Sequence, residues 1–170
     1  LITGERKEPL EIMELTGGCI CCTVSEELGA ALSELTARRN AGKADFDTLV
    51  IETTGVADPL ALVNTFFLDP ETAANYLVDG VVTGIDCVSS IERMAEFPEA
   101  AVQAGCADLL VLTKTDLVSE ARVHEVIHAL RHANARAKIV VADENFDVAS
   151  VLDVKGFNLN SDMGDVGQPC

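Results

Sequence analysis

The chain has 170 residues, of which 48% are apolar and none is tryptophan, and this suffices for one domain with an aliphatic core. Its net charge of −16 argues against binding to nucleic acid or to anionic membrane surfaces. No apolar run reaches the length of about 18 residues that a transmembrane helix needs, so no membrane span is expected.

The first predicted element is a short strand at residues 11–15, which leads into a cysteine cluster. Cys19, Cys21 and Cys22 are three of the six cysteines and follow two glycines directly. On a strand Cys22 would point away from the other two, so convergence on one ion requires a turn, which glycine favours. Thiolates at this spacing can bind one soft metal ion. Because adjacent cysteines form disulfides only under strain, the cluster indicates a metal site in a cytoplasmic protein.

A helix is predicted next, with Ser25 as its N-cap and Gly42 as its stop. An apolar run at residues 46–51 predicts a buried strand that leads into the sequence ETTG. A carboxylate at a strand end, here Glu52, can hold a magnesium-bound water or orient an attacking one. Gly55 can bring its backbone N–H close to a phosphate. Taken alone, ETTG indicates only a turn.

The remaining elements alternate between helix and strand. They are a helix from Asp58-Pro59, a strand at 79–88 ending near Asp86, a helical stretch to about Gly105, a strand at 108–112, a helix at 119–133, a strand at 138–142 and a helical turn at 148–152. This rhythm predicts an α/β fold with a parallel, doubly wound sheet and helices on both faces. Ligands bind at the carboxyl ends of such strands, which is where the cysteine cluster, ETTG and Asp86 are expected.

The sequence TKTD follows the strand at 108–112 and resembles the NKxD base-recognition motif of GTPases. The Asp116 carboxylate can accept two hydrogen bonds from guanine N1 and N2, which adenine cannot supply. The Lys114 stem can lie along the base plane. Thr113 stands where asparagine is usual. The alternative interpretation is a polar loop that contains a charged pair.

The other candidate metal ligands have less specific patterns. His124, His128 and His132 are spaced by four residues, which places them along one face of a helix. The favoured interpretation is a solvated helix face, and a weak accessory metal site is the alternative. Cys87 and Cys106 lie among apolar residues and are expected to be buried core thiols.

The segments GCICC, ETTGVADP and QAGCADLLVLTKTDL, in this order, resemble the CobW-type metal-chaperone GTPases, relatives of UreG and HypB, over residues 11–152. The resemblance implies a P-loop NTPase fold and a cytoplasmic GTP hydrolase that delivers zinc or cobalt to a client metalloprotein. It implies GTP with Mg²⁺ as the nucleotide and leaves a homodimer open. The implied site residues are Glu52 and Gly55 for catalysis, Thr113, Lys114 and Asp116 for the base, and Cys19, Cys21 and Cys22 for the metal.

The chain departs from the family pattern because it contains no GxxxxGK[ST] loop. We therefore expect residues 1–155 to be a partial, N-terminally truncated GTPase domain without the C-terminal domain of many members, and residues 156–170 to be a loop or the start of a linker. Without the phosphate cradle, the chain is expected to bind GTP weakly or not at all. The alternatives are a zinc-binding regulatory or storage module without GTPase activity, a redox protein and a structural domain with incidental thiols.

Overall fold

The computed structural model describes residues 23–55, 57–152 and 154–156, which form two compact units. Unit 1 comprises the described residues up to Thr53 together with Leu60–Leu77, and unit 2 comprises Thr54–Pro59 and the described residues from Val78 onward. The predicted strand at 11–15 lies outside the described residues, and the predicted domain boundaries stay a prediction. None of the described helices is long and apolar enough to cross a lipid bilayer.

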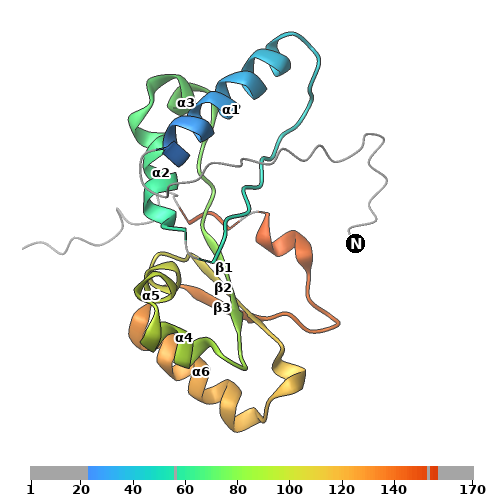
Figure 1. Ribbon diagram of the computed structural model, residues 1–170. Helices are drawn as coiled ribbons and strands as arrows, with labels where there is room; N and C mark the ends of the chain where they lie inside the picture. The colour runs from blue at the N-terminus through green and yellow to red at the C-terminus, as the bar shows by residue number, and fades with distance from the viewer. Residues whose placement is uncertain (1–22, 56, 153, 157–170) are drawn as a thin grey trace, which may run out of the picture. The chain divides into compact units, whose positions relative to one another are not determined.

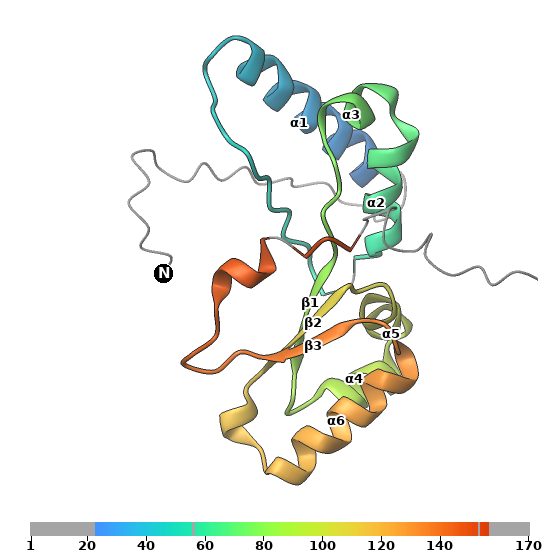
Figure 2. The same cartoon turned by 180° about the vertical axis from the view of Figure 1, so that it is seen from behind.

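Unit 1 consists of helices. They are α1 (Thr23–Asn40), α2 (Pro59–Leu68), which begins at the boundary of the units, and α3 (Pro70–Asn75). Along α1 every fourth residue is buried, at Leu28, Leu32 and Thr36, because this spacing follows one face of a helix. Figure 2 shows α1 beside α3. The Tyr76 hydroxyl joins them, since it donates to the Leu32 carbonyl and accepts from the Thr36 hydroxyl, both at 3.1 Å.

The structure corrects two predictions in unit 1. Helix α1 begins at Thr23, so Ser25 lies inside the helix and is not its N-cap. Residues 46–51 do not form a strand, and Val50 is 71% exposed. A strand needs a neighbouring strand for its backbone hydrogen bonds, and no described strand pairs with this run. The predicted stop of α1 is confirmed, because Gly42 adopts a positive φ of 67° two residues after the helix ends.

Unit 2 is an α/β layer built on a parallel sheet in the order β1-β2-β3. Its elements are β1 (Val82–Asp86), α4 (Ser90–Glu96), α5 (Pro98–Gly105), β2 (Leu109–Thr113), the 3₁₀ helix η1 (Thr115–Leu117), α6 (Glu120–Ala133), β3 (Lys138–Val141) and the 3₁₀ helix η2 (Val148–Val151). Figure 1 shows α4, α5 and α6 packed along these strands. The predicted strands at 79–88, 108–112 and 138–142 and the predicted helix at 119–133 are confirmed.

The core of unit 2 lies between the sheet and its helices. Leu110 and Leu112 alternate along β2 and are fully buried, as are Ala104 of α5 and Val126 and Leu130 of α6. Consecutive parallel strands joined by right-handed connections place both crossovers on one face of the sheet, which explains why these helices share one core. This packing fixes the strands so that β1 and β2 end together, with Asp86 beside Thr113.

Asn134 connects three elements of unit 2 at the end of α6. Its Nδ2 donates to the carbonyl oxygens of Ala104, Gly105 and Ala107 at 3.0, 3.0 and 2.8 Å, and its Oδ1 accepts from the Ala137 N–H at 2.9 Å. The last carbonyls of α5 have no partner within their own helix, so an outside donor is required. Asn134 therefore closes the end of α5 and positions the start of both β2 and β3.

We expect Asn134→Ala to lower the free energy of unfolding by about 2 kcal/mol, because several carbonyls lose their donor at once. The measurement is urea denaturation followed by circular dichroism. Asn145→Ala is the matched control, since Asn145 is exposed in the loop after β3, and it should change stability by less than about 0.5 kcal/mol. Equal effects of the two substitutions would contradict the role of Asn134.

Candidate functional site

The candidate site lies at the carboxyl edge of the sheet, where β1 and β2 end. Asp86 and Thr113 are register partners at the last position of the two strands. The Thr113 hydroxyl donates to the Ile85 carbonyl at 3.1 Å, and the Cys87 N–H donates to the Thr113 carbonyl at 3.1 Å. These cross-strand bonds hold the two strand ends together. The structure thus confirms that Asp86 and TKTD meet at one edge, as the strand pattern predicts.

Lys114 turns the chain from β2 into η1 and joins the two strand ends. Its backbone is left-handed, with φ 57° and ψ 31°, which is uncommon for a residue other than glycine and costs about 1–2 kcal/mol. Its Nζ lies 2.6 Å from Asp86 Oδ2. The Lys114 ammonium, assisted by the Val88 N–H, holds the pKa of Asp86 below its ordinary value. Such backbone strain concentrates at functional sites, where the surrounding structure maintains it.

Asp116 lies two residues further on, in η1, with an exposed side chain. Among the described residues no hydrogen-bond donor or cation engages its carboxylate, whereas each carboxylate oxygen of Asp86 already accepts a hydrogen bond. The Asp86 carboxylate is therefore paired within the protein, whereas the Asp116 carboxylate is available to a ligand. Base recognition by TKTD requires an Asp116 carboxylate that is open to a ligand.

Arg122 of α6 holds the chain that directly follows β1, and this role was not predicted from the sequence. Its guanidinium donates to the carbonyl oxygens of Cys87 and Val88, both at 3.3 Å, and pairs with Glu92 of α4 at 2.6 Å. The hydrogen bonds from Arg122 lower the pKa of Glu92. A positively charged side chain in the first turn of a helix is unfavourable, because it opposes the helix dipole. The position of Arg122 at the start of a predicted helix could therefore have indicated that it pairs with a group outside the helix.

The predicted catalytic residues fall in different units. Glu52 belongs to unit 1 and is exposed, and its role stays a prediction. Gly55 belongs to unit 2, where a Cβ built on it would meet no atom within 4 Å, so packing does not require glycine there. Gln103 of α5 secures this loop, because its Nε2 donates to the carbonyl oxygens of Thr54 and Ala57 at 3.3 and 2.8 Å. Gln103 is the first residue of the segment QAGCADLLVLTKTDL, but no role was predicted for it.

Five of the six cysteines divide into two groups. Cys19, Cys21 and Cys22 lie outside the described residues, so their metal role stays a prediction. Cys87 is fully buried and Cys106 half-buried, and burial raises the pKa of both thiols. They therefore remain protonated, as expected of core thiols. Over the described part of the chain, no group of three or more His, Cys, Asp or Glu side chains is arranged to hold a metal ion.

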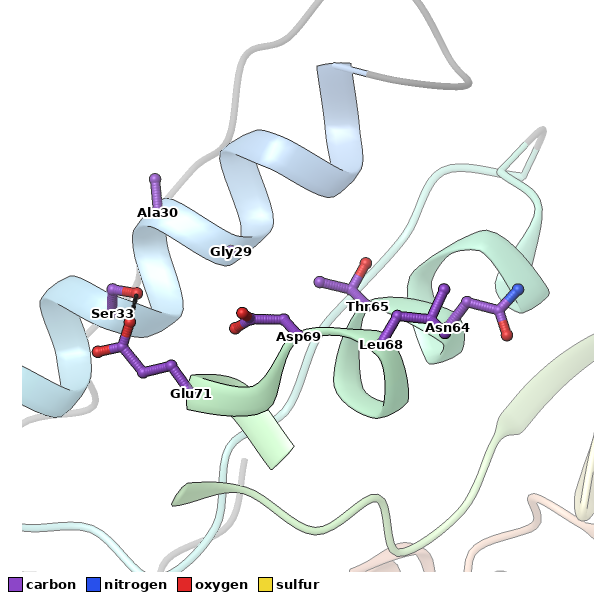
Figure 3. Close-up of a pocket in the computed structure, with 8 residues that line it drawn as sticks. All are labelled: Gly29, Ala30, Ser33, Asn64, Thr65, Leu68, Asp69 and Glu71. Carbon is purple, nitrogen blue, oxygen red and sulfur yellow. Dashed lines mark hydrogen bonds between the residues drawn. The ribbon is translucent and has the colours of Figure 1, made fainter. Parts of the chain in front are cut away.

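Unit 1 contains an open groove of about 510 Å³ between α1 and the α2–α3 corner, shown in Figure 3. Its two carboxylates already have partners. Asp69 accepts from the Thr72 N–H and hydroxyl, which lowers its pKa, and Glu71 accepts from the Ser33 hydroxyl at 3.2 Å. Both contacts stabilise the junction of helices, so the groove is structural and is not the candidate site.

Comparison with known proteins identifies the family. The family model described as CobW/HypB/UreG, nucleotide-binding domain, matches residues 1–141. The zinc chaperone YjiA of Escherichia coli (strain K12) is 41% identical over 155 residues, which cover 90% of this chain and 48% of the relative. The zinc-regulated GTPase metalloprotein activator 1 of Schizosaccharomyces pombe is 34% identical, over 86% of this chain and 36% of the relative. The chain thus spans about half, or less, of the length of these curated relatives.

Solved structures agree with this assignment. The crystal structure of Zn(II)-bound YjiA GTPase from E. coli aligns with a TM-score of 0.71 at 38% identity, covering 76% of this chain and 41% of that one. A Zn(II)-bound triple mutant of the same GTPase, in which a glutamate and two adjacent cysteines are replaced by alanine, aligns with a TM-score of 0.72 at 37% identity and the same coverage. The parallel sheet is therefore of the P-loop NTPase type, and the chain belongs to the CobW/HypB/UreG nucleotide-binding domain family.

Proposed function

We propose that this chain is part of a GTP-hydrolysing metallochaperone that binds zinc or cobalt at Cys19, Cys21 and Cys22 and delivers the metal to a client metalloprotein. The observation that carries the proposal is the available Asp116 carboxylate beside the strained, anchored Lys114 at the sheet edge. Relatives named as a zinc chaperone and as a zinc-regulated GTPase support it. We place the activity in the cytoplasm, where thiols stay reduced.

Guanine recognition would use the TKTD loop. The Asp116 carboxylate accepts hydrogen bonds from the N1 and N2 groups of the base, which gives selectivity against adenine. The ion pair with Asp86 fixes the Lys114 ammonium, so that the aliphatic stem is held at the edge and can lie along the base plane. The Thr113 hydroxyl already donates to the Ile85 carbonyl, so its contribution is to hold the loop in place.

Phosphate chemistry would use the ETTG segment. The Glu52 carboxylate is exposed, and a carboxylate oxygen is the type of ligand that Mg²⁺ or a magnesium-bound water prefers. When bound, Mg²⁺ neutralises the charge that develops on the phosphates. Gly55 leaves open space around its Cα, which suits close approach of a phosphate to its backbone N–H. Gln103 holds the loop that contains Gly55.

Metal transfer would use the cysteine cluster. Three thiolates leave a fourth zinc position for water, a client ligand or another side chain, and an open position favours transfer over storage. The cluster follows the predicted strand at 11–15, and a loop at the end of a strand is where an α/β fold places its ligands. A change of nucleotide state could then alter the geometry of the thiolates and, with it, the affinity for zinc.

We expect the zinc affinity of the full-length gene product to differ about tenfold or more between its GDP form and its form with a non-hydrolysable GTP analogue. The measurement is competition with a chromophoric chelator in each nucleotide state. Asp116→Asn is the control, because it should abolish the difference and leave nucleotide-free zinc affinity unchanged. Equal affinity in the two nucleotide states of the unsubstituted protein would contradict the coupling and favour a zinc-storage module.

A further inference from the structure

Helix α6 carries all three histidines of the chain on its exposed side. His124, His128 and His132 are each exposed, which confirms the predicted solvated face. The opposite side of the same helix is anchored in the core of unit 2 by Val126 and Leu130, which are fully buried. Because this packing holds the helix backbone in place, the spacing between the Cα atoms of the histidines is set before any ligand binds.

Two of the three imidazoles lie against each other. The ring centroids of His128 and His132 are 4.7 Å apart with an interplanar angle of 67°. Within the described parts of the chain, neither ring has a hydrogen-bond or ion-pair partner. Each ring, when neutral, therefore keeps a nitrogen lone pair that is free to bind a metal ion. The described contacts give His124 no such ring partner.

The charged neighbours of the pair do not oppose a cation. Arg131 precedes His132, but its guanidinium is directed to the chain after the helix, where it donates to the Ala137 carbonyl at 2.6 Å. Glu125, one turn before His128, pairs with Arg122 at 2.9 Å. The net charge of −16 raises the concentration of divalent cations near the surface.

We propose that His128 and His132 chelate one zinc ion on the outer face of α6, with water completing its coordination. Two residues four apart on a helix lie about 6 Å apart at Cβ, and tetrahedral zinc requires its two nitrogen ligands about 3.3 Å apart. Rings already in edge contact reach that separation by rotation about χ2. The site is distinct from the cysteine cluster and does not depend on nucleotide, so it stands whether or not the proposed GTPase function is correct.

A site with two protein ligands binds zinc weakly and releases it quickly, in contrast to a cluster of thiolates. We expect it to take up zinc only after the cysteines are filled. It would give the chain a second, exchangeable zinc ion on the surface of unit 2.

The test uses the 170-residue chain with Cys19, Cys21 and Cys22 replaced by serine, and Zn²⁺ as the probe in calorimetry. His128→Ala and His132→Ala should each weaken zinc binding about tenfold or more, because each leaves a single imidazole ligand. His124→Ala is the matched control, since it removes an exposed histidine from the same helix, and it should change the affinity less than twofold. A loss with His124→Ala equal to that of the other two variants would overturn the pairing of His128 with His132.

A second measurement avoids the cysteine substitutions. In the unsubstituted chain, zinc added beyond the first equivalent should shift the NMR signals of the imidazole ring protons of His128 and His132, and leave those of His124 in place. Unchanged signals for His128 and His132, or equal shifts for all three histidines, would overturn the proposal.

Discussion

Replacing Cys21 with serine is expected to weaken zinc binding by the chain about 100-fold. Structural zinc sites contribute about 10–16 kcal/mol through their ligands together, so one thiolate accounts for about 3 kcal/mol. A serine hydroxyl stays protonated at neutral pH and cannot replace a thiolate in binding a soft metal ion. The measurement is competition for Zn²⁺ with a chromophoric chelator, restricted to the first and tightest equivalent so that weaker sites do not contribute.

Cys106→Ser is the matched control for this prediction. It makes the same replacement of sulfur by oxygen, at a thiol whose pKa is raised by burial and by the nearby Asp58. Because this thiol stays protonated, its loss should leave zinc affinity unchanged. Titration of free thiols gives a second readout, since bound zinc should protect Cys19, Cys21 and Cys22 from modification. An unchanged affinity in Cys21→Ser, or no protection by zinc, would contradict the metal role and favour a redox role.

The second large effect concerns the base of the nucleotide. Asp116→Asn in the full-length gene product should lower the affinity for GTP at least about 100-fold, because two charge-assisted hydrogen bonds to guanine are lost. The same substitution should raise the affinity for xanthosine triphosphate. Xanthine carries a carbonyl at C2 in place of the amino group, and the asparagine amide can donate to it. Fluorescent nucleotide competition measures both affinities.

Asp143→Asn provides the control for this selectivity switch. Asp143 is also exposed in a loop after a strand. Among the described residues its side chain accepts only from the Asn145 N–H, at 2.8 Å, and an asparagine oxygen can equally accept this bond. It should leave both nucleotide affinities unchanged. If Asp116→Asn lowers the affinity for GTP without raising the affinity for xanthosine triphosphate, Asp116 supports the fold of the loop and does not contact the base. If GTP binding is unaffected, the proposal for TKTD is wrong.

Much of unit 2 could be predicted from the sequence, because its elements have strong local signals. The predicted helix at 119–133 matches α6, and Ser119 caps it by accepting a hydrogen bond from the Arg122 N–H. The apolar run of β2 indicates a strand buried on both faces, and Leu109–Leu112 are all buried. The position of TKTD directly after that run predicted its place at the sheet edge.

The failed strand prediction at residues 46–51 shows the limit of such signals. Its second half, Leu49-Val50-Ile51, is as apolar as β2, yet Val50 is 71% exposed whereas Leu110 is fully buried. An apolar run indicates only that a segment can be buried. Whether it becomes a strand depends on a neighbour that accepts its backbone hydrogen bonds, which β1 and β3 supply for β2.

The sequence by itself determined the family, the α/β order of unit 2 and the candidate site residues in TKTD and GCICC, because motifs and periodicity are properties of neighbouring residues. Only the tertiary structure decided which of those residues meet. The pairing of Lys114 with Asp86 and the closure of α5 by Asn134 join groups 28 and 30 residues apart in the chain. Such contacts arise from the packing of helices on the parallel sheet, which brings together groups that no local pattern relates.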